Sequence, residues 1–178
     1  MATRKWQIIF SGVGGQGLML AGNIMGRAAV EFQGLNAVMT SVYGVETRGT
    51  FTKSDLIISP EQIAFPEVQQ PDVVIALDAI AYNRYVASLP ENCLLIYDSA
   101  IAPGESPAKQ LSYPIAEKAK ELGNPAVANV ISLGILVGLT QLMDVEAMQQ
   151  AISNEFSNRA NIAELNLKAF ASGLAMVS

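Results

Sequence analysis

WQIIFSGVGGQG, at residues 6–17, sets the class of fold that this sequence can adopt. The run from Trp6 to Ser11 is apolar and ends in glycines, which is typical of a buried strand followed by a tight turn. From Leu18 to Phe32 apolar residues recur at helical spacing, and Gly34 follows them in the place of a helix C-cap. The segment 6–34 therefore predicts a strand, a glycine-rich turn and a helix in succession.

The rest of the chain continues the alternation of strands and helices. Further strands are expected at 35–41, 51–59, 73–77 and 93–97, of which the last two are the aliphatic runs VVIAL and CLLIY. Helices are expected after Asp78, at 116–122, from Ala126 to Met143, after Asp144, and from about Asn161, where Asn161 and Glu164 resemble a capping box. We therefore expect a single α/β domain over residues 1–178, with a mostly parallel, Rossmann-like sheet, helices on both of its faces and a helical C-terminal third.

The composition excludes several kinds of chemistry. The 178 residues include no histidine and one cysteine, and only 15% of them are charged, with a formal net charge of −5. A chain without histidine has no Ser-His-Asp triad and no imidazole ligand for zinc, and one cysteine cannot hold an iron–sulfur cluster or close an internal disulfide. We interpret Cys93, inside an aliphatic strand, as an inert core thiol. We expect no catalytic residue and no metal site on this chain, and its acidic balance argues against nucleic acid as a partner.

Two apolar stretches raise the question of a secretion signal or a membrane span. Trp6 to Phe10 is too short for the apolar core of a signal peptide, and glycines interrupt it at once. The stretch from Leu122 to Met143 lacks charged residues, but it opens with Gly-Asn-Pro and carries further polar residues. We interpret it as a helix buried on most sides, within the fold or against a partner, and we expect a cytoplasmic protein with no membrane span.

Gly12, Gly14 and Gly17 complete a G-x-G-x-x-G pattern between the predicted strand and helix. Glycines let the backbone turn sharply and approach a phosphate closely, and the N–H groups at the helix start would point at that phosphate. Two other interpretations stay open: the turn serves only close packing of the helix on the strand, or it binds NAD(P) or FAD. The dinucleotide interpretation lacks the expected carboxylate after the second strand, which ends in Met39-Thr40-Ser41.

YGVETRGT, at residues 43–50, connects the second and third predicted strands. It should lie at the same edge of the sheet as the glycine turn. Its Arg48 is placed to reach a phosphate or carboxylate, or to pair with Glu46 in a surface loop. Asp78 and Asp98 each follow a strand, and we interpret both as helix N-caps or turn residues rather than catalytic acids.

The two loops together, GVGGQG at 12–17 and YGVETRGT at 43–50, resemble the gamma subunit, or gamma domain, of the 2-oxoacid:ferredoxin (acceptor) oxidoreductases. The resemblance covers nearly the whole chain. Thr50 departs from the family, which usually has a second glycine after Arg-Gly. Features elsewhere that fit the family are the strand 51–59, the entry PDVV at 71–74, the run NVISLG at 129–134, Asn166 and Gly173.

The resemblance implies a subunit that is inactive alone. The family oxidatively decarboxylates a 2-oxoacid with coenzyme A, giving acyl-CoA and CO2, and passes the electrons to ferredoxin. The resemblance implies alpha and beta subunits as partners, with a ferredoxin-like delta subunit as a further candidate. Thiamine diphosphate, Mg²⁺ and the iron–sulfur clusters would lie on those partners, and none of them on this chain.

The resemblance also implies roles for the residues of the two loops. The glycine loop would bind a phosphate of coenzyme A through backbone N–H groups and the glutamine side chain. Arg48 would neutralise that ligand or anchor its loop at a subunit interface. The cofactor-binding residues carried over by position are Gly12, Gly14, Gly15, Gln16, Gly17 and Arg48.

Three alternatives differ in what the chain binds. It could be a free-standing NAD(P)- or FAD-binding oxidoreductase, a structural subunit whose glycine loop binds nothing, or a subunit of an indolepyruvate oxidoreductase in the same family. The general look of the Tyr-Gly…Arg-Gly region and the compact length favour 2-oxoglutarate over pyruvate as the substrate of the complex. The low content of charge further predicts that the isolated chain self-associates or is poorly soluble.

Overall fold

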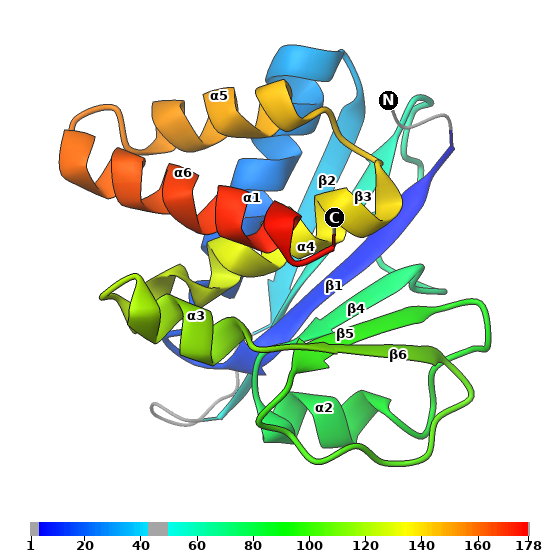
Figure 1. The fold of residues 1–178 in the computed structure, drawn as a ribbon. Coiled ribbons are helices and arrows are strands. Elements are labelled where there is room, and N and C mark those ends of the chain that lie inside the picture. Colours follow the sequence, from blue (N-terminus) through cyan, green and yellow to red (C-terminus); the bar gives the residue numbers. More distant parts are fainter. Residues whose placement is uncertain (1–3, 43–49, 178) are drawn as a thin grey trace.

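A six-stranded sheet forms the centre of the molecule (Figure 1). The computed structural model describes residues 4–42 and 50–177. The order of strands across the sheet is β2-β3-β1-β4-β5-β6. The strands are β1 (Trp6–Val13), β2 (Asn36–Val42), β3 (Phe51–Ser59), β4 (Val73–Ala76), β5 (Leu94–Asp98) and β6 (Lys109–Tyr113).

The prediction of a mostly parallel sheet is confirmed. β1, β4, β5 and β6 pair in parallel, whereas β3 pairs antiparallel with both β1 and β2. β3 is therefore the one described strand that runs against the rest. The reversal follows from the connection between β2 and β3, because residues 43–50 are too few for the crossover of a dozen or more residues that a parallel pair needs.

The sequence-based prediction missed β6, which lies at one edge of the sheet. None of its residues KQLSY is fully buried: Lys109 and Ser112 are exposed, and the other three are half-buried. An edge strand of this kind lacks the continuous aliphatic run that marks β4 and β5. The other five strands were predicted within two residues of their observed ends.

Helices cover both faces of the sheet, as predicted, but unequally. Among the described helices, only α2 packs on one face, where Ala81 and Tyr82 join the core, and the others pack on the opposite face (Figure 1). The helices are α1 (Leu18–Arg27), which continues as a π-helix η1 (Ala28–Phe32), α2 (Ala79–Tyr85), α3 (Ile115–Glu121), a 3-10 turn η2 (Pro125–Val127), α4 (Ala128–Thr140), α5 (Val145–Glu155) and α6 (Ala160–Ala175).

The predicted buried helix is α4, and it is apolar on all sides because other elements surround it. Residues Asn129 to Val137 are all buried. On its outer side α4 crosses α6 at Gly134 and Gly173, where a Cβ on either glycine would lie 2.2 or 2.1 Å from a carbonyl oxygen of the other helix. In the part of the chain that the structure describes, no helix combines the length and the apolar character needed to cross a membrane.

One predicted helix start differs from the structure, and a second is confirmed in its position. The capping box at Asn161 and Glu164 is wrong, because α6 already begins at Ala160 and makes no side-chain cap hydrogen bond. Glu164 instead pairs with Lys168 one turn later, at 2.6 Å. Asp144 does hold the N-cap position of α5, but its side chain makes no cap hydrogen bond.

Candidate functional site

The candidate site lies at the carboxyl ends of β1 and β4, the two parallel strands at the middle of the sheet. The helix that follows β1 packs on one face and the helix that follows β4 packs on the other. Connections that leave in opposite directions open a crevice between the two strand ends, which is the usual ligand site of open α/β sheets. The glycine loop stands at this crevice.

The glycine loop is shorter than the sequence suggested. β1 continues through Val13, so that Gly12 belongs to the strand and pairs with Thr52 of β3. The turn itself needs left-handed backbone at Gly15, with φ 96°, and at Gly17, with φ 70°. No described residue accepts a hydrogen bond from the N–H groups of Gly15, Gly17 and Leu18. These three donors at the start of α1 are available to an anion.

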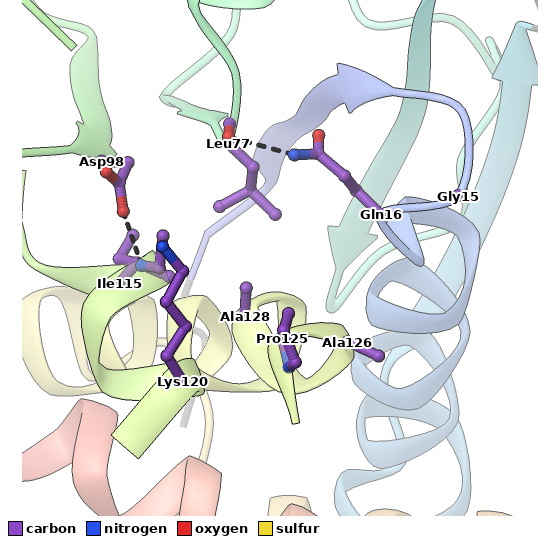
Figure 2. A pocket seen from close by; sticks show the side chains of 10 residues that line it. Gly15, Gln16, Leu77, Asp98, Ile115, Lys120, Pro125, Ala126 and Ala128 are labelled. Carbon is purple, nitrogen blue, oxygen red and sulfur yellow. Dashed lines mark hydrogen bonds between the residues drawn. The ribbon is translucent and has the colours of Figure 1, made fainter. Parts of the chain in front are cut away.

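Gln16 ties the loop to the neighbouring strand. Its Oε1 accepts a hydrogen bond from the N–H of Val13 at 2.8 Å, and its Nε2 donates to the carbonyl oxygen of Leu77 at 3.2 Å, just beyond β4 (Figure 2). A Cβ on Gly12 would lie 2.1 Å from Oε1 of Gln16, so the glycine makes room for this side chain. The amide therefore spans the crevice and holds the loop in place. The predicted contact of Gln16 with a phosphate stays a prediction.

Asn129, at the start of α4, holds the other end of the loop. This residue is 2% exposed, and its Nδ2 donates to the carbonyl oxygen of Gly17 at 2.9 Å. A Cβ on Gly17 would lie 2.4 Å from the same nitrogen, in addition to the strain at positive φ. The end of the loop is thereby fixed by a contact between residues 112 positions apart.

A cavity of about 330 Å³ opens beside the loop, between the ends of β4 and β5 and the starts of α3 and α4. Figure 2 shows Lys120 of α3 extending along one wall, opposite the loop residues Gly15 and Gln16. Lys120 forms no ion pair with any described residue. The walls are mostly apolar, with the lining residues Gly15, Gln16, Leu77, Asp98, Ile115, Ala116, Lys120, Pro125, Ala126 and Ala128. The cavity thus combines the free backbone N–H of Gly15 on one side with a lysine side chain on the other.

A second cavity, of about 360 Å³, lies against the opposite side of the glycine loop. It is lined by residues 13–19 and by Thr52 of β3. β2 ends and β3 begins at this edge, since Val42 pairs with Lys53 and Val13 with Phe51. Arg48, the remaining predicted site residue, lies outside the described residues.

The two aspartates at strand ends cap helices, as predicted. Asp78 is the N-cap of α2, where its Oδ1 accepts from the N–H of Ile80 at 2.9 Å. Asp98 caps α3 from a distance: one carboxylate oxygen accepts from the N–H of Ala100 at 2.9 Å and the other from the N–H of Ala116 at 2.6 Å. Its carboxylate thereby joins β5 to the helix that carries Lys120.

Cys93 is buried, as predicted, in the apolar cluster on the face of the sheet that α2 covers. Burial is the main cause that raises the pKa of its thiol from 9.0 to about 11, and the charge of Asp72 acts in the same direction. The thiolate form is therefore scarce at neutral pH. Among the described residues, no group of three or more acidic or cysteine side chains is placed to hold a metal ion.

Sequence reasoning missed three features that shape this site: Asn129, Lys120 and the contact of Asp98 with α3. The sequence gives no local sign that Asn129 reaches the loop, because the contact depends on how α4 crosses the sheet. Lys120 lies on a short helix with other charged residues and stands out only once the cavity is seen.

The chain is similar to known proteins in its sequence and in its fold. The chain matches the family model described as pyruvate ferredoxin/flavodoxin oxidoreductase over residues 7–176. The 2-oxoglutarate synthase subunit KorC of Methanocaldococcus jannaschii is 37% identical over 172 residues, covering 94% of this chain and 91% of that protein.

Two solved structures share the fold. The gamma subunit of keto/oxoacid ferredoxin oxidoreductase from Geobacter sulfurreducens PCA is 37% identical, with a TM-score of 0.82 over 97% of this chain and 98% of that chain. The 2-oxoglutarate:ferredoxin oxidoreductase of Magnetococcus marinus, solved with 2-oxoglutarate, coenzyme A and succinyl-CoA bound, has a TM-score of 0.86. The two chains are 23% identical, and the match covers 98% of this chain and 31% of that chain. At this identity the similarity supports the fold alone.

Proposed function

Because the chain belongs to the pyruvate ferredoxin/flavodoxin oxidoreductase family, as a gamma-type subunit, we propose that it works inside a 2-oxoacid:ferredoxin oxidoreductase complex and forms part of the coenzyme A site. The observation that carries the proposal is the glycine loop, whose unpaired N–H groups stand beside a cavity at the crevice of the sheet. The isolated chain is inactive on this view, because it offers no group for the oxidative chemistry.

The site suits one part of coenzyme A rather than the whole molecule. Ligand pockets commonly have volumes of about 300 to 1,000 Å³. At about 330 Å³ the cavity is at the small end of that range. The diphosphate of coenzyme A is the portion that needs N–H donors and a cation, and in this cavity Gly15 would supply a donor and Lys120 the cation. The rest of the coenzyme would extend toward sister subunits.

The reaction needs groups that we assign to those sister subunits. Thiamine diphosphate with Mg²⁺ would carry out the decarboxylation there, and iron–sulfur clusters would pass electrons to ferredoxin. We propose alpha and beta subunits as the partners, with a ferredoxin-like delta subunit as a further one, in the cytoplasm. This division agrees with a chain of 178 residues that contains no histidine and one cysteine, buried in its core.

We propose 2-oxoglutarate as the substrate of the complex. The support is the 37% identity to a 2-oxoglutarate synthase subunit over most of both chains. An indolepyruvate oxidoreductase subunit would have the same fold and the same coenzyme A site. Assays of the purified complex with 2-oxoglutarate, pyruvate and indolepyruvate, each with coenzyme A and ferredoxin, distinguish these cases by rate.

The binding of coenzyme A is tested on the complex purified through a tag on this chain. Titration calorimetry of the wild type and of Gly15→Val measures the dissociation constant. Gly15 has φ 96°, and no atom beyond its chain neighbours lies within 4 Å of the position that a Cβ would take, so that the valine side chain would project into open space at the loop. We expect affinity for coenzyme A to fall at least tenfold, because the phosphate can no longer approach the backbone closely.

Gly34→Val is the matched control. Gly34 also has positive φ, at 64°, and open space at its Cβ, but it lies at the far end of the helix that the loop begins. It therefore introduces the same kind of backbone strain without touching the site. Lys120→Ala and Arg48→Ala measure separately how much each of these two cations contributes to the affinity for coenzyme A. The proposal fails if Gly15→Val binds coenzyme A as tightly as Gly34→Val does.

A further inference from the structure

The carbonyl oxygen of Gly17, at the end of the glycine loop, accepts two hydrogen bonds. One comes from the N–H of Ala21 at 3.0 Å and is the first of α1, and the other comes from Nδ2 of Asn129 at 2.9 Å. Gly17 holds the N-cap position of α1 with left-handed backbone, and no side-chain cap hydrogen bond forms there. The orientation of the peptide between Gly17 and Leu18 is therefore set in part from α4.

This peptide also carries one of the free donors of the loop. The C=O of Gly17 and the N–H of Leu18 belong to one planar trans peptide, so the two groups point in opposite directions. Holding the carbonyl toward Asn129 therefore directs the N–H of Leu18 away from it. No described residue accepts a hydrogen bond from this N–H, and Leu18 lines the second cavity beside the loop. Asn129 thus acts on the donor through the peptide.

The start of α4 holds the side chain of Asn129 in place. The residue is 2% exposed, and its Oδ1 accepts a hydrogen bond from the N–H of Val130 at 2.8 Å. Its backbone carbonyl accepts from Oγ of Ser132 at 2.6 Å. Turning the amide away from the loop would leave buried polar groups without partners, which is costly. The amide is therefore a fixed donor to the loop.

The segment that carries Asn129 also forms a wall of the first cavity. Pro125 and Ala126 of η2 and Ala128 of α4 line that cavity (Figure 2). Asn129 is not among the described residues that line either cavity. One short segment therefore shapes the first cavity and, through its buried asparagine, holds the end of the loop.

We propose that Asn129 is a positioning residue for the binding of coenzyme A, an inference that rests on the proposed function. Its hydrogen bond directs the N–H of Leu18 toward a phosphate of the coenzyme. It also strengthens that N–H as a donor, because linked hydrogen bonds polarise one another. Asn129 itself touches neither the coenzyme nor the 2-oxoacid.

Kinetics and titration calorimetry of the complex, purified through a tag on this chain, test the role. Asn129→Ala removes the donor, and Asn129→Leu removes it while keeping the site filled. Both should raise the KM and the dissociation constant for coenzyme A by roughly five- to tenfold, the effect of one lost hydrogen bond. Inorganic diphosphate, as a competitor of coenzyme A, should lose affinity by the same factor. The KM for the 2-oxoacid should stay at the wild-type value, because we assign its site to the sister subunits.

Asn166→Ala is the matched control. Asn166 is 5% exposed, and its Nδ2 donates to the carbonyl oxygen of Ile162 at 2.8 Å within α6. The variant therefore loses a buried amide of the same kind whose hydrogen bond stays inside its own helix. Its KM for coenzyme A should equal that of the wild type. Circular dichroism and co-purification of the sister subunits check that each variant is folded and assembled.

Three results would overturn the proposal. One is a wild-type KM for coenzyme A in both Asn129 variants, another is an equal rise in Asn166→Ala, and the third is an equal rise in the KM for the 2-oxoacid. Gly15→Val, measured in the same series, separates this inference from the proposed function. If Gly15→Val weakens binding and the Asn129 variants do not, this inference alone fails. If Gly15→Val binds coenzyme A as tightly as Gly34→Val does, the proposed function fails as well.

Discussion

Gly173→Ala should destabilise the fold more than any ordinary helix substitution from glycine to alanine. Gly173 of α6 and Gly134 of α4 let the two helix backbones touch. A Cβ on Gly173 would lie 2.1 Å from the carbonyl oxygen of Ile131 and 3.0 Å from the Cα of Gly134. Both contacts are with backbone atoms, which cannot move aside without moving a helix. The two helices must therefore separate by roughly 1 Å.

The expected magnitude is the sum of two opposing effects. Replacement of glycine by alanine inside a helix stabilises the helix by about 1 kcal/mol. Forcing extra atoms into a packed core costs about 1 to 3 kcal/mol, and a clash between two backbones belongs at the upper end of that range or above it. We expect a net loss of about 2 to 3 kcal/mol, which for a chain of this size lowers Tm by about 4 to 12 °C.

Urea denaturation of the isolated chain measures the effect, with Gly26→Ala as its control. Gly26 is also inside a helix, α1, but its Cβ would meet the Cδ1 of Leu56 at 3.5 Å, an ordinary van der Waals contact. That variant should gain about 0.5 to 1 kcal/mol from helix propensity alone. If Gly173→Ala proves as stable as Gly26→Ala, the close crossing of α4 and α6 does not exist in solution.

Three further changes test the site and the core. Gln16→Glu keeps the acceptor for the N–H of Val13 but sets a carboxylate oxygen against the carbonyl oxygen of Leu77. The free energy of unfolding in urea should therefore fall by about 1 to 3 kcal/mol. An unchanged denaturation midpoint would contradict the bridge between the strands. Asp98→Ala leaves the start of α3 without its cap and should lower the free energy of unfolding by about 1 to 2 kcal/mol in the same assay. It should also weaken the binding of coenzyme A, because α3 carries Lys120. Burial raises the pKa of Cys93 to about 11 in the folded chain. From pH 9 upward the unfolded chain therefore loses its thiol proton while the folded chain keeps it. The free energy of unfolding should fall between pH 9 and 11 as a result. Cys93→Ala should reduce that fall, and an equally steep fall in the variant would show that the thiol is not its source.

Much of the fold could be predicted from the sequence, because its strands are marked by local pattern. VVIA of β4 and LLIY at residues 94–97 of β5 are continuous apolar runs, and both strands lie inside the sheet with helices on each face. β6 could not be predicted in the same way, since an edge strand needs no apolar run. The capping box at Asn161 failed because Asn161 lies inside α6, whose N-cap is Arg159, and Glu164 pairs with Lys168 instead.

The site was harder to predict than the fold, because its geometry depends on contacts between distant segments. The glycine pattern identified the loop, but it did not show that Gln16 is engaged at both ends of its amide within the chain. It also did not show that Asn129 binds the loop from 112 residues away. Such contacts are set by the crossing of α4 over the sheet, which no local pattern of residues encodes.

The order of the strands bears on the alternative of a free-standing dinucleotide-binding oxidoreductase. In a dinucleotide site the second strand lies beside the first, and a carboxylate at its end reaches the ribose of the cofactor. Here β3 is inserted between β1 and β2, so the end of β2 lies two strand spacings, about 10 Å, from β1. β2 also ends without a carboxylate, in Met39-Thr40-Ser41-Val42.

The side chain of Gln16 adds a second obstacle to that alternative. Its amide bridges the ends of β1 and β4, which is the crevice that a dinucleotide would cross. A phosphate bound at the free N–H groups at the start of α1 would use none of the atoms that form this bridge. This geometry therefore suits the proposed binding of a phosphate at the start of α1 better than the binding of a dinucleotide across the crevice. Quenching of NADH fluorescence by the isolated chain would contradict this conclusion.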